Sequence, residues 1–175
     1  EYYINDAGKQ IDNLALSVNA RYLELLGKEV EFPENGYHGQ DIIETAKRII
    51  AKDGDKYLNM SDEERLSIFK ELALKEKLAA LKEDLAAFNV HFDVWFSERT
   101  LHPDAVNAVC DKLLANGNMY KQDGALWLKS TAYGDDKDRV VIRDNGVPTY
   151  LAADIAYHDN KFERKFDKLI NIWGA

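Results

Sequence analysis

The sequence predicts a mixed α/β fold, in which strand and helix elements near both ends suggest a parallel sheet and a helical and antiparallel-hairpin insertion lies between them. Three observations predict it. A short aromatic strand pattern, EYYIND, is followed by turn residues and then by apolar residues at helical spacing. A helix pattern and an apolar strand pattern occupy the stretch from Pro148 to Ala175. Amphipathic helices and three short strand patterns lie between these two regions.

Composition limits the classes of function that are possible. The 175 residues are 46% hydrophobic and 31% charged, which is ordinary for a globular domain, and no apolar run reaches membrane-spanning length. No signal peptide or lipid-anchor pattern is present, so no membrane partner is expected. The net charge of −8 excludes a basic surface that would grip nucleic acid broadly. Any contact with RNA is therefore expected to be local.

The cysteine and histidine residues bear on compartment and metal binding. A single cysteine, Cys110, excludes an internal disulfide and suits a reducing compartment, so we expect a cytoplasmic protein. The four histidines are scattered, without a second ligand at the spacing that zinc sites use. The sequence therefore predicts no metal site.

The first third of the chain reads as a strand followed by helices. Apolar residues recur at helical spacing from Ile11 to Leu26, and Gly27 is a natural helix stop. Residues 31–39 contain proline and glycine and predict a loop, and an amphipathic helix follows over 42–50. The expected arrangement is strand, turn, helix, loop and second helix.

A long charged helix is expected next. Ser61 and Glu64 have the spacing of a capping box, in which each residue satisfies a backbone amide of the other. An apolar stripe with alternating gaps of four and three then runs along the helix at Leu74, Leu78, Leu81, Leu85 and Phe88. Such a stripe could dock a partner helix, but packing against the other helices of this chain is the favoured interpretation.

The later part of the chain predicts a strand, a helix and a small meander. VHFDVWF, residues 90–96, has strand character, and the next helix has Pro103 in its first turn and Cys110 on its apolar face. Cys110 is therefore interpreted as a core residue and not as a nucleophile. NMYKQ, ALWLKS and DRVVIRD predict three antiparallel strands, and KLINIWGA at 168–175 predicts a buried strand.

Tyr150 and Asp154 form the most informative pair. They lie four residues apart, on one face of the helix that Thr149 is expected to cap. A carboxylate accepts two parallel hydrogen bonds from a guanidinium, and a tyrosine offers its ring face or hydroxyl to the same cation. The pair is suited to binding an arginine side chain, although such pairs are also common on solvated helices.

Four stretches together resemble arginyl-tRNA synthetases of the bacterial type. They are YYINDAGKQI (2–11), FDVWFSE (92–98), the long run from Gly124 to His158, and the closing NIWGA. The resemblance implies an internal fragment of a class I, Rossmann-like nucleotide-binding catalytic domain. On this basis we expect residues 1–30 and 148–175 to belong to the catalytic fold, and 31–147 to be mainly its connective insertion.

The resemblance also implies roles for individual residues. Tyr150 and Asp154 match the pair of the family that selects arginine, and Asp6, Gly8 and Gln10 match its Asp-x-Gly-x-Gln element beside the active site. The candidate lining residues of the active site are Asn5, Asp6, Gln10 and His158. From the residues alone, Asn5 and Asp6 could equally form a turn that caps the following helix, and packing or capping is favoured for His158.

For the parent enzyme, the resemblance implies activation of arginine with ATP and magnesium, followed by transfer to tRNA(Arg). We expect the parent enzyme to be a monomer. The His-x-Gly-His signature and the lysine loop of class I synthetases are not found in these residues. We therefore assign no catalytic residue within the chain, expect no cofactor bound to it, and expect it to be inactive alone.

The two ends of the sequence bear on whether the chain is a whole protein. The chain starts on EYYIND without a methionine and stops on an apolar run, which predicts a piece of a longer protein. Three alternatives stay open: a non-catalytic arginine-binding module, an RNA-docking piece, and another class I aminoacyl-tRNA synthetase.

Overall fold

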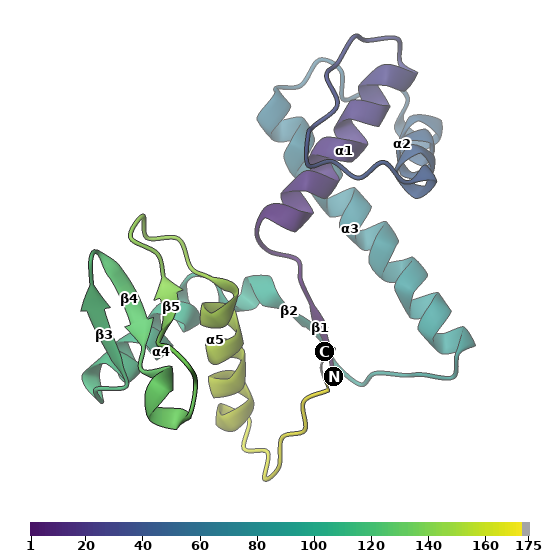
Figure 1. The fold of residues 1–175 in the computed structure, drawn as a ribbon. Helices are drawn as coiled ribbons and strands as arrows, with labels where there is room; N and C mark the ends of the chain where they lie inside the picture. The colour runs from purple at the N-terminus through teal and green to yellow at the C-terminus, as the bar shows by residue number, and fades with distance from the viewer. Residues whose placement is uncertain (173–175) are drawn as a thin grey trace. The chain divides into compact units, whose positions relative to one another are not determined.

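The computed structural model describes residues 1–172 and divides the chain into two compact units, Glu1–Phe96 and a second unit that begins at Ser97 (Figure 1). The mixed α/β fold is confirmed. The described elements, in chain order, are β1 (Tyr2–Ile4), α1 (Lys9–Leu25), α2 (Gln40–Asp53), α3 (Asp62–Ala87), β2 (Trp95–Ser97), the 3-10 helix η1 (Glu98–Leu101), α4 (Asp104–Ala115), β3 (Met119–Gln122), β4 (Ala125–Leu128), the 3-10 helix η2 (Ser130–Tyr133), β5 (Arg139–Ile142) and α5 (Tyr150–Glu163).

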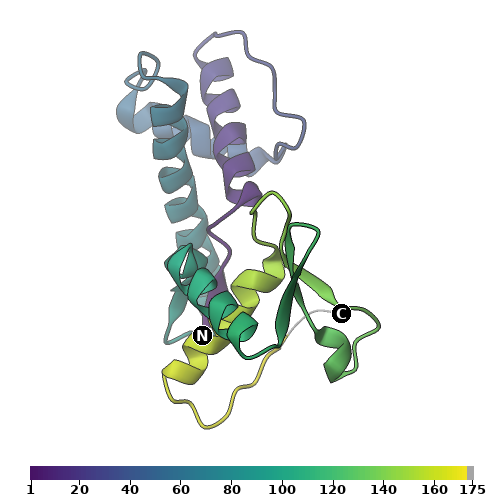
Figure 2. The same cartoon turned by 90° about the vertical axis from the view of Figure 1, so that its left-hand side faces the viewer.

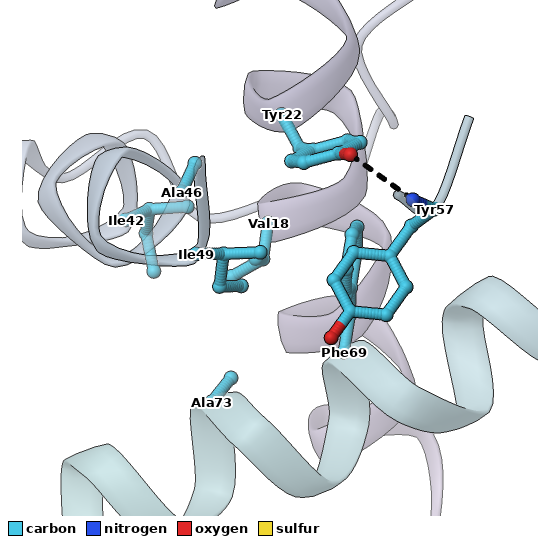
Figure 3. Packing of buried hydrophobic residues seen from close by; sticks show 8 residues of the cluster. All are labelled: Val18, Tyr22, Ile42, Ala46, Ile49, Tyr57, Phe69 and Ala73. Carbon is cyan, nitrogen blue, oxygen red and sulfur yellow. Dashed lines mark hydrogen bonds between the residues drawn. The ribbon is translucent and has the colours of Figure 1, made fainter. Parts of the chain in front are cut away.

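The first unit is built on three helices, of which α1 contacts both α2 and α3, and on the short pair of strands β1 and β2. Each helix buries one face, and for α1 and α2 this is the apolar face that the sequence pattern predicted. Helix α3 buries Arg65, Phe69 and Ala73. The resulting core cluster consists of Val18, Tyr22, Ile42, Ala46, Ile49, Tyr57, Phe69 and Ala73 (Figure 3).

A buried tyrosine ties this core to the segment between α2 and α3. The Tyr22 side chain is fully buried, and its hydroxyl donates to the Gly54 carbonyl at 3.0 Å. The same oxygen accepts the Tyr57 amide at 3.3 Å (Figure 3). Its ring meets that of Phe69 edge-on, with 4.9 Å between ring centres. Burial raises the pKa of Tyr22, so the phenol stays protonated and remains a donor.

The helix ends follow their predicted signals. The capping box of α3 is formed, because Ser61 Oγ accepts the Glu64 amide and the Glu64 carboxylate accepts the Ser61 amide. Gly27 follows α1 with φ of 73°, and Lys28 N–H donates to the Leu23 carbonyl at 3.0 Å. This closes the end of α1 in the Schellman pattern, which needs a left-handed residue where glycine stands.

Polar contacts join α2 to α3 beside the core. The Glu76 carboxylate accepts hydrogen bonds from Thr45 Oγ1 at 2.6 Å and from Arg48 Nη2 at 2.6 Å. One residue further on, Lys77 Nζ lies 2.6 Å from Asp41 Oδ2. The hydrogen bond from Lys77 lowers the pKa of Asp41, so this ion pair is formed at neutral pH.

The apolar stripe of α3 was expected to pack against the other helices, and it does so only in part. The fully packed positions of α3 are Phe69 and Ala73, which precede the stripe. Leu74, Leu78 and Leu81 are half-buried and line a cavity described below, whereas Phe88 is 85% exposed. The helix therefore packs against its neighbours mainly through its amino-terminal half.

The second unit is an antiparallel meander with two helices (Figure 2). Strands β3, β4 and β5 pair in chain order, with Gln122 opposite Ala125 across the two-residue Asp123–Gly124 turn. The meander prediction is confirmed. Helix α4 contacts β3, α5 contacts β5, and the two helices contact each other. Cys110 is buried in α4, as predicted for a core residue.

Three local predictions differ from the structure. The strand expected over 90–96 is shorter and lies at Trp95–Ser97, and Pro103 precedes α4 at its N-cap position. The strand expected over 168–175 is not formed within residues 168–172, where Ile170 and Ile172 are 80% and 92% exposed; the remainder lies outside the described residues. A buried strand needs a neighbouring strand for its backbone hydrogen bonds. Among the described residues, β1 pairs with β2 and not with the segment 168–172.

None of the helices within residues 1–172 has the length and apolar character to cross a membrane.

Candidate functional site

Tyr150 and Asp154 lie one turn apart at the start of α5, as predicted. Tyr150 is 71% exposed and Asp154 is also exposed. The buried residues of this helix are Ala152, Ala153, Ala156 and Tyr157. Among residues 1–172, neither the Asp154 carboxylate nor the Tyr150 hydroxyl has a hydrogen-bonding or ion-pair partner. Both polar groups are therefore available to a ligand from solvent.

Thr149 holds the start of this helix, although not as the sequence predicted. It occupies the N-cap position with extended backbone angles, but its side chain makes no capping hydrogen bond. The hydroxyl points to β5, where the carbonyl oxygens of Val140 and Val141 lie at 2.9 and 3.1 Å. The Thr149 amide also donates to the Val141 carbonyl at 2.9 Å. The start of α5 is thus fastened to the meander.

His158 lies one turn beyond Asp154 on the same helix. Its Nδ1 is 2.8 Å from the Asp154 carbonyl oxygen, and its ring meets that of Tyr157 edge-on, 6.2 Å between centres. The imidazole is half-buried. These contacts favour a packing role for the ring, as the residue pattern alone also indicated.

The other candidates, Asn5, Asp6 and Gln10, belong to the first unit at the end of β1. Asp6 is 5% exposed and its amide donates to the Ile4 carbonyl at 2.9 Å, which turns the chain directly after the strand. Gly8, with φ of 78°, is the N-cap of α1, and no side chain caps the helix there. Asn5 and Gln10 are exposed.

Asn5 and Gln10 line a cavity of about 520 Å³ within the first unit, whereas Asp6 does not. The cavity combines aromatic, amide and leucine side chains with the Lys77–Asp41 ion pair at its wall. The remaining lining residues are Tyr2, Tyr3, Ile4, Ile11, Leu14, Tyr37, His38, Gly39, Ile42, Leu74, Leu78 and Leu81. The sequence did not predict this cavity, because its lining comes from four separate segments. The leucine stripe was the only signal of it.

A second buried acid also escaped the sequence analysis. Glu98 ends the FDVWFSE stretch, is 7% exposed, and lies in η1, which contacts α5 in the second unit. Its Oε1 is 3.6 Å from His102 Nε2. Among the described residues, no group of three or more histidine, cysteine, aspartate or glutamate side chains is placed to hold a metal ion.

Comparison with known proteins identifies the class of catalytic domain. The family described as tRNA synthetases class I (R), catalytic domain, matches residues 3–174. The chain belongs to this family.

The most informative relatives are arginine–tRNA ligases. Those of Heliobacterium modesticaldum and Carboxydothermus hydrogenoformans are each 56% identical over 176 aligned positions that include the whole chain. The chain spans only 31% and 32% of these two relatives. The putative arginyl-tRNA synthetase of Campylobacter jejuni matches 99% of the chain and 38% of its own, with a TM-score of 0.88 and 41% identity. The Plasmodium falciparum arginyl-tRNA synthetase, at 13% identity and a TM-score of 0.57, shares the fold.

Proposed function

We propose that this chain is part of an arginine–tRNA ligase and that it supplies the side chains that select arginine. The observation that carries the proposal is the exposed Tyr150–Asp154 pair at the start of α5, without a partner among residues 1–172. The arginine–tRNA ligases that match the whole chain at 56% identity support the identity of the amino acid.

The chemistry of the pair suits recognition and not proton transfer. A guanidinium is planar, permanently charged and presents parallel N–H groups that match the two oxygens of a carboxylate. The Tyr150 ring or hydroxyl would contact the same cation from one turn away on the helix. Tyr150 and Asp154 therefore act as selectors in this proposal, and neither is a general acid or base.

The reaction of the whole enzyme has two steps. The arginine carboxylate attacks the α-phosphate of ATP, which gives arginyl-adenylate and pyrophosphate, and the arginyl group then passes to the terminal ribose of tRNA(Arg). ATP with magnesium would supply the activating chemistry. The described residues of this chain do not form a set that fits a metal ion, and the sequence lacks the phosphate-binding signature of the family. We therefore assign ATP binding to other parts of the enzyme.

The remaining candidates take supporting positions. Asn5, Asp6 and Gln10 are proposed to line the active site of the full-length enzyme, and Asn5 and Gln10 also line the cavity of the first unit. For His158, the other candidate lining residue, we propose the packing role that its contacts with Asp154 and Tyr157 favour. Residues 1–30 and 148–175 are assigned to the catalytic fold, and 31–147 mainly to its connective insertion. We also propose that the enzyme is monomeric, cytoplasmic and without a membrane partner; the single buried, unpaired cysteine supports a reducing compartment.

The proposal is tested with the full-length protein that contains this sequence, alongside the isolated chain. With tRNA present, pyrophosphate exchange and tRNA charging are measured with arginine, lysine and citrulline. Lysine keeps the charge without the planar fork, and citrulline keeps the shape without the charge. We expect the full-length protein to use arginine and to reject the other two, and the isolated chain to stay at background.

Three outcomes would contradict the proposal. Charging with another amino acid would make the parent a different class I synthetase. Pyrophosphate exchange by the isolated chain would show that the ATP half of the site lies within these residues. If neither protein supports exchange but the isolated chain binds arginine in preference to lysine, the chain is a non-catalytic binding module.

A further inference from the structure

We infer that Thr149 is a positioning residue for arginine selection, because its hydroxyl fastens the start of α5 to β5 and so fixes the Tyr150–Asp154 pair. The inference rests on the proposed function. Thr149 precedes Tyr150 directly, and the two selectors are separated by a single helical turn. Any displacement of the helix start moves both selectors together.

Thr149 makes hydrogen bonds both to strand β5 and within the first turn of helix α5. Its hydroxyl lies 2.9 Å from the Val140 carbonyl and 3.1 Å from the Val141 carbonyl, and its amide donates to the Val141 carbonyl at 2.9 Å. Its own carbonyl accepts the Ala152 amide at 3.1 Å, inside the first turn of α5. Thr149 therefore connects β5 to the helix through its amide, its hydroxyl and its carbonyl.

The segment that leads into Thr149 is also held against β5. Pro148 forms an isolated antiparallel bridge with Ile142, and the Arg143 amide donates to the Val147 carbonyl at 3.0 Å. Val141, which receives the Thr149 amide, is fully buried. The chain thus reverses after β5 through a bonded turn, and Thr149 is the last residue that the strand holds before the helix begins.

The direction of the hydroxyl distinguishes this role from ordinary capping. A threonine at an N-cap usually accepts an amide of the first helical turn, and that contact stabilises the helix alone. Here no such hydrogen bond is made, and the hydroxyl donates to a neighbouring element. Its removal is therefore expected to loosen the placement of α5 more than the formation of α5.

The test uses the full-length enzyme and the variants Thr149→Val and Thr149→Ser. Valine keeps the shape of threonine but has no hydroxyl, whereas serine keeps the donor. Thr131→Val is the matched control in the same unit, because Thr131 lies in η2 and its hydroxyl donates to Asp138 Oδ1 at 2.8 Å and not to β5. KM for arginine and for ATP, kcat, and the preference for arginine over homoarginine are measured per active site.

We expect Thr149→Val to raise KM for arginine about fivefold to tenfold, which matches the loss of one hydrogen bond. KM for ATP should stay within about twofold of wild type. The preference for arginine over homoarginine should fall, because a Tyr150–Asp154 pair that is less firmly positioned discriminates less between side chains of different length. Thr149→Ser should restore KM for arginine to within about twofold of wild type, and Thr131→Val should leave it unchanged.

An unchanged KM for arginine in Thr149→Val would overturn the inference. Parallel changes in both KM values, or a failure of serine to restore arginine binding, would also overturn it, since they indicate a general structural effect. The variant Asp154→Asn distinguishes a failure of this inference from a failure of the proposed function. If Asp154→Asn impairs arginine use while Thr149→Val does not, only the positioning role is wrong; if neither variant affects arginine use, the selector assignment itself is wrong.

Discussion

Tyr22 and Tyr150 carry the same side chain in opposite surroundings. Tyr22 is fully buried, and its hydroxyl both donates to a backbone carbonyl and accepts a backbone amide. Tyr150 is 71% exposed and has no partner among residues 1–172. A buried polar group must be satisfied within the protein, whereas an exposed one is free to meet a ligand. Tyr22 therefore contributes to stability, and recognition is the role that we propose for Tyr150.

The role of Tyr22 gives a stability prediction. Tyr22→Phe keeps the ring but leaves the Gly54 carbonyl and the Tyr57 amide without their partner, so α1 should lose about 1–3 kcal/mol of protection. The measurement is hydrogen exchange of the buried α1 amides in the full-length protein. Tyr37→Phe is the control, because Tyr37 is 42% exposed, and it should change protection by less than about 0.5 kcal/mol. Equal effects of the two variants would contradict the assignment.

At the scale of elements, Glu76 joins helices α2 and α3. Its carboxylate accepts hydrogen bonds from Thr45, which is fully buried, and from Arg48. Burial opposes the charged form, but the hydrogen bonds from Arg48 and Thr45 outweigh it and lower the pKa of Glu76. A carboxylate with a lowered pKa stabilises the folded state above the pKa of the unfolded chain. That stabilisation is lost as the pH falls through the lower pKa of the folded state.

Glu76→Gln tests this connection. The substitution should lower the free energy of unfolding by about 1 kcal/mol at pH 7, because the charge-assisted bonds weaken while the geometry is kept. The deficit relative to wild type should shrink as the pH falls below 4.5, the ordinary value for this side chain. Hydrogen exchange of α2 and α3 across this pH range measures it. Glu83→Gln, an exposed position on α3, is the control, and a deficit that does not depend on pH would argue against the ionic contribution.

At the scale of the whole molecule, the candidate residues fall into two groups. Asn5, Asp6 and Gln10 belong to the first unit, and Tyr150, Asp154 and His158 belong to the second. The chain spans 31% of the length of its Heliobacterium relative. The active-site roles proposed for these residues therefore concern the full-length enzyme, and ATP binding is assigned to other parts of it.

The features that the sequence predicted correctly depend on local signals. Apolar periodicity defined α1 and α2, the Ser61–Glu64 spacing defined the start of α3, and the Asp123–Gly124 turn with its flanking strands defined the meander. The i, i+4 spacing likewise placed Tyr150 and Asp154 on one face of α5. Each of these patterns is complete within a short stretch of chain.

The features that escaped prediction depend on distant partners. An apolar run at residues 168–172 resembles a strand, but a strand forms only where a neighbour supplies hydrogen bonds. Thr149 was recognised as an N-cap, yet the choice between its own helix and β5 as hydrogen-bond partner depends on how the meander packs. The cavity of the first unit likewise exists only once four segments have come together.

The arginine KM of the Asp154→Asn variant, measured in the full-length enzyme with tRNA present, tests the central claim most directly. Asparagine keeps the size of the side chain but removes its charge and one of its two acceptor oxygens. We expect KM for arginine to rise about tenfold to a hundredfold, the cost of a hydrogen-bonded pair with a charged group, while KM for ATP stays unchanged. An arginine KM equal to that of the wild-type enzyme would contradict the account and remove Asp154 from the arginine pocket.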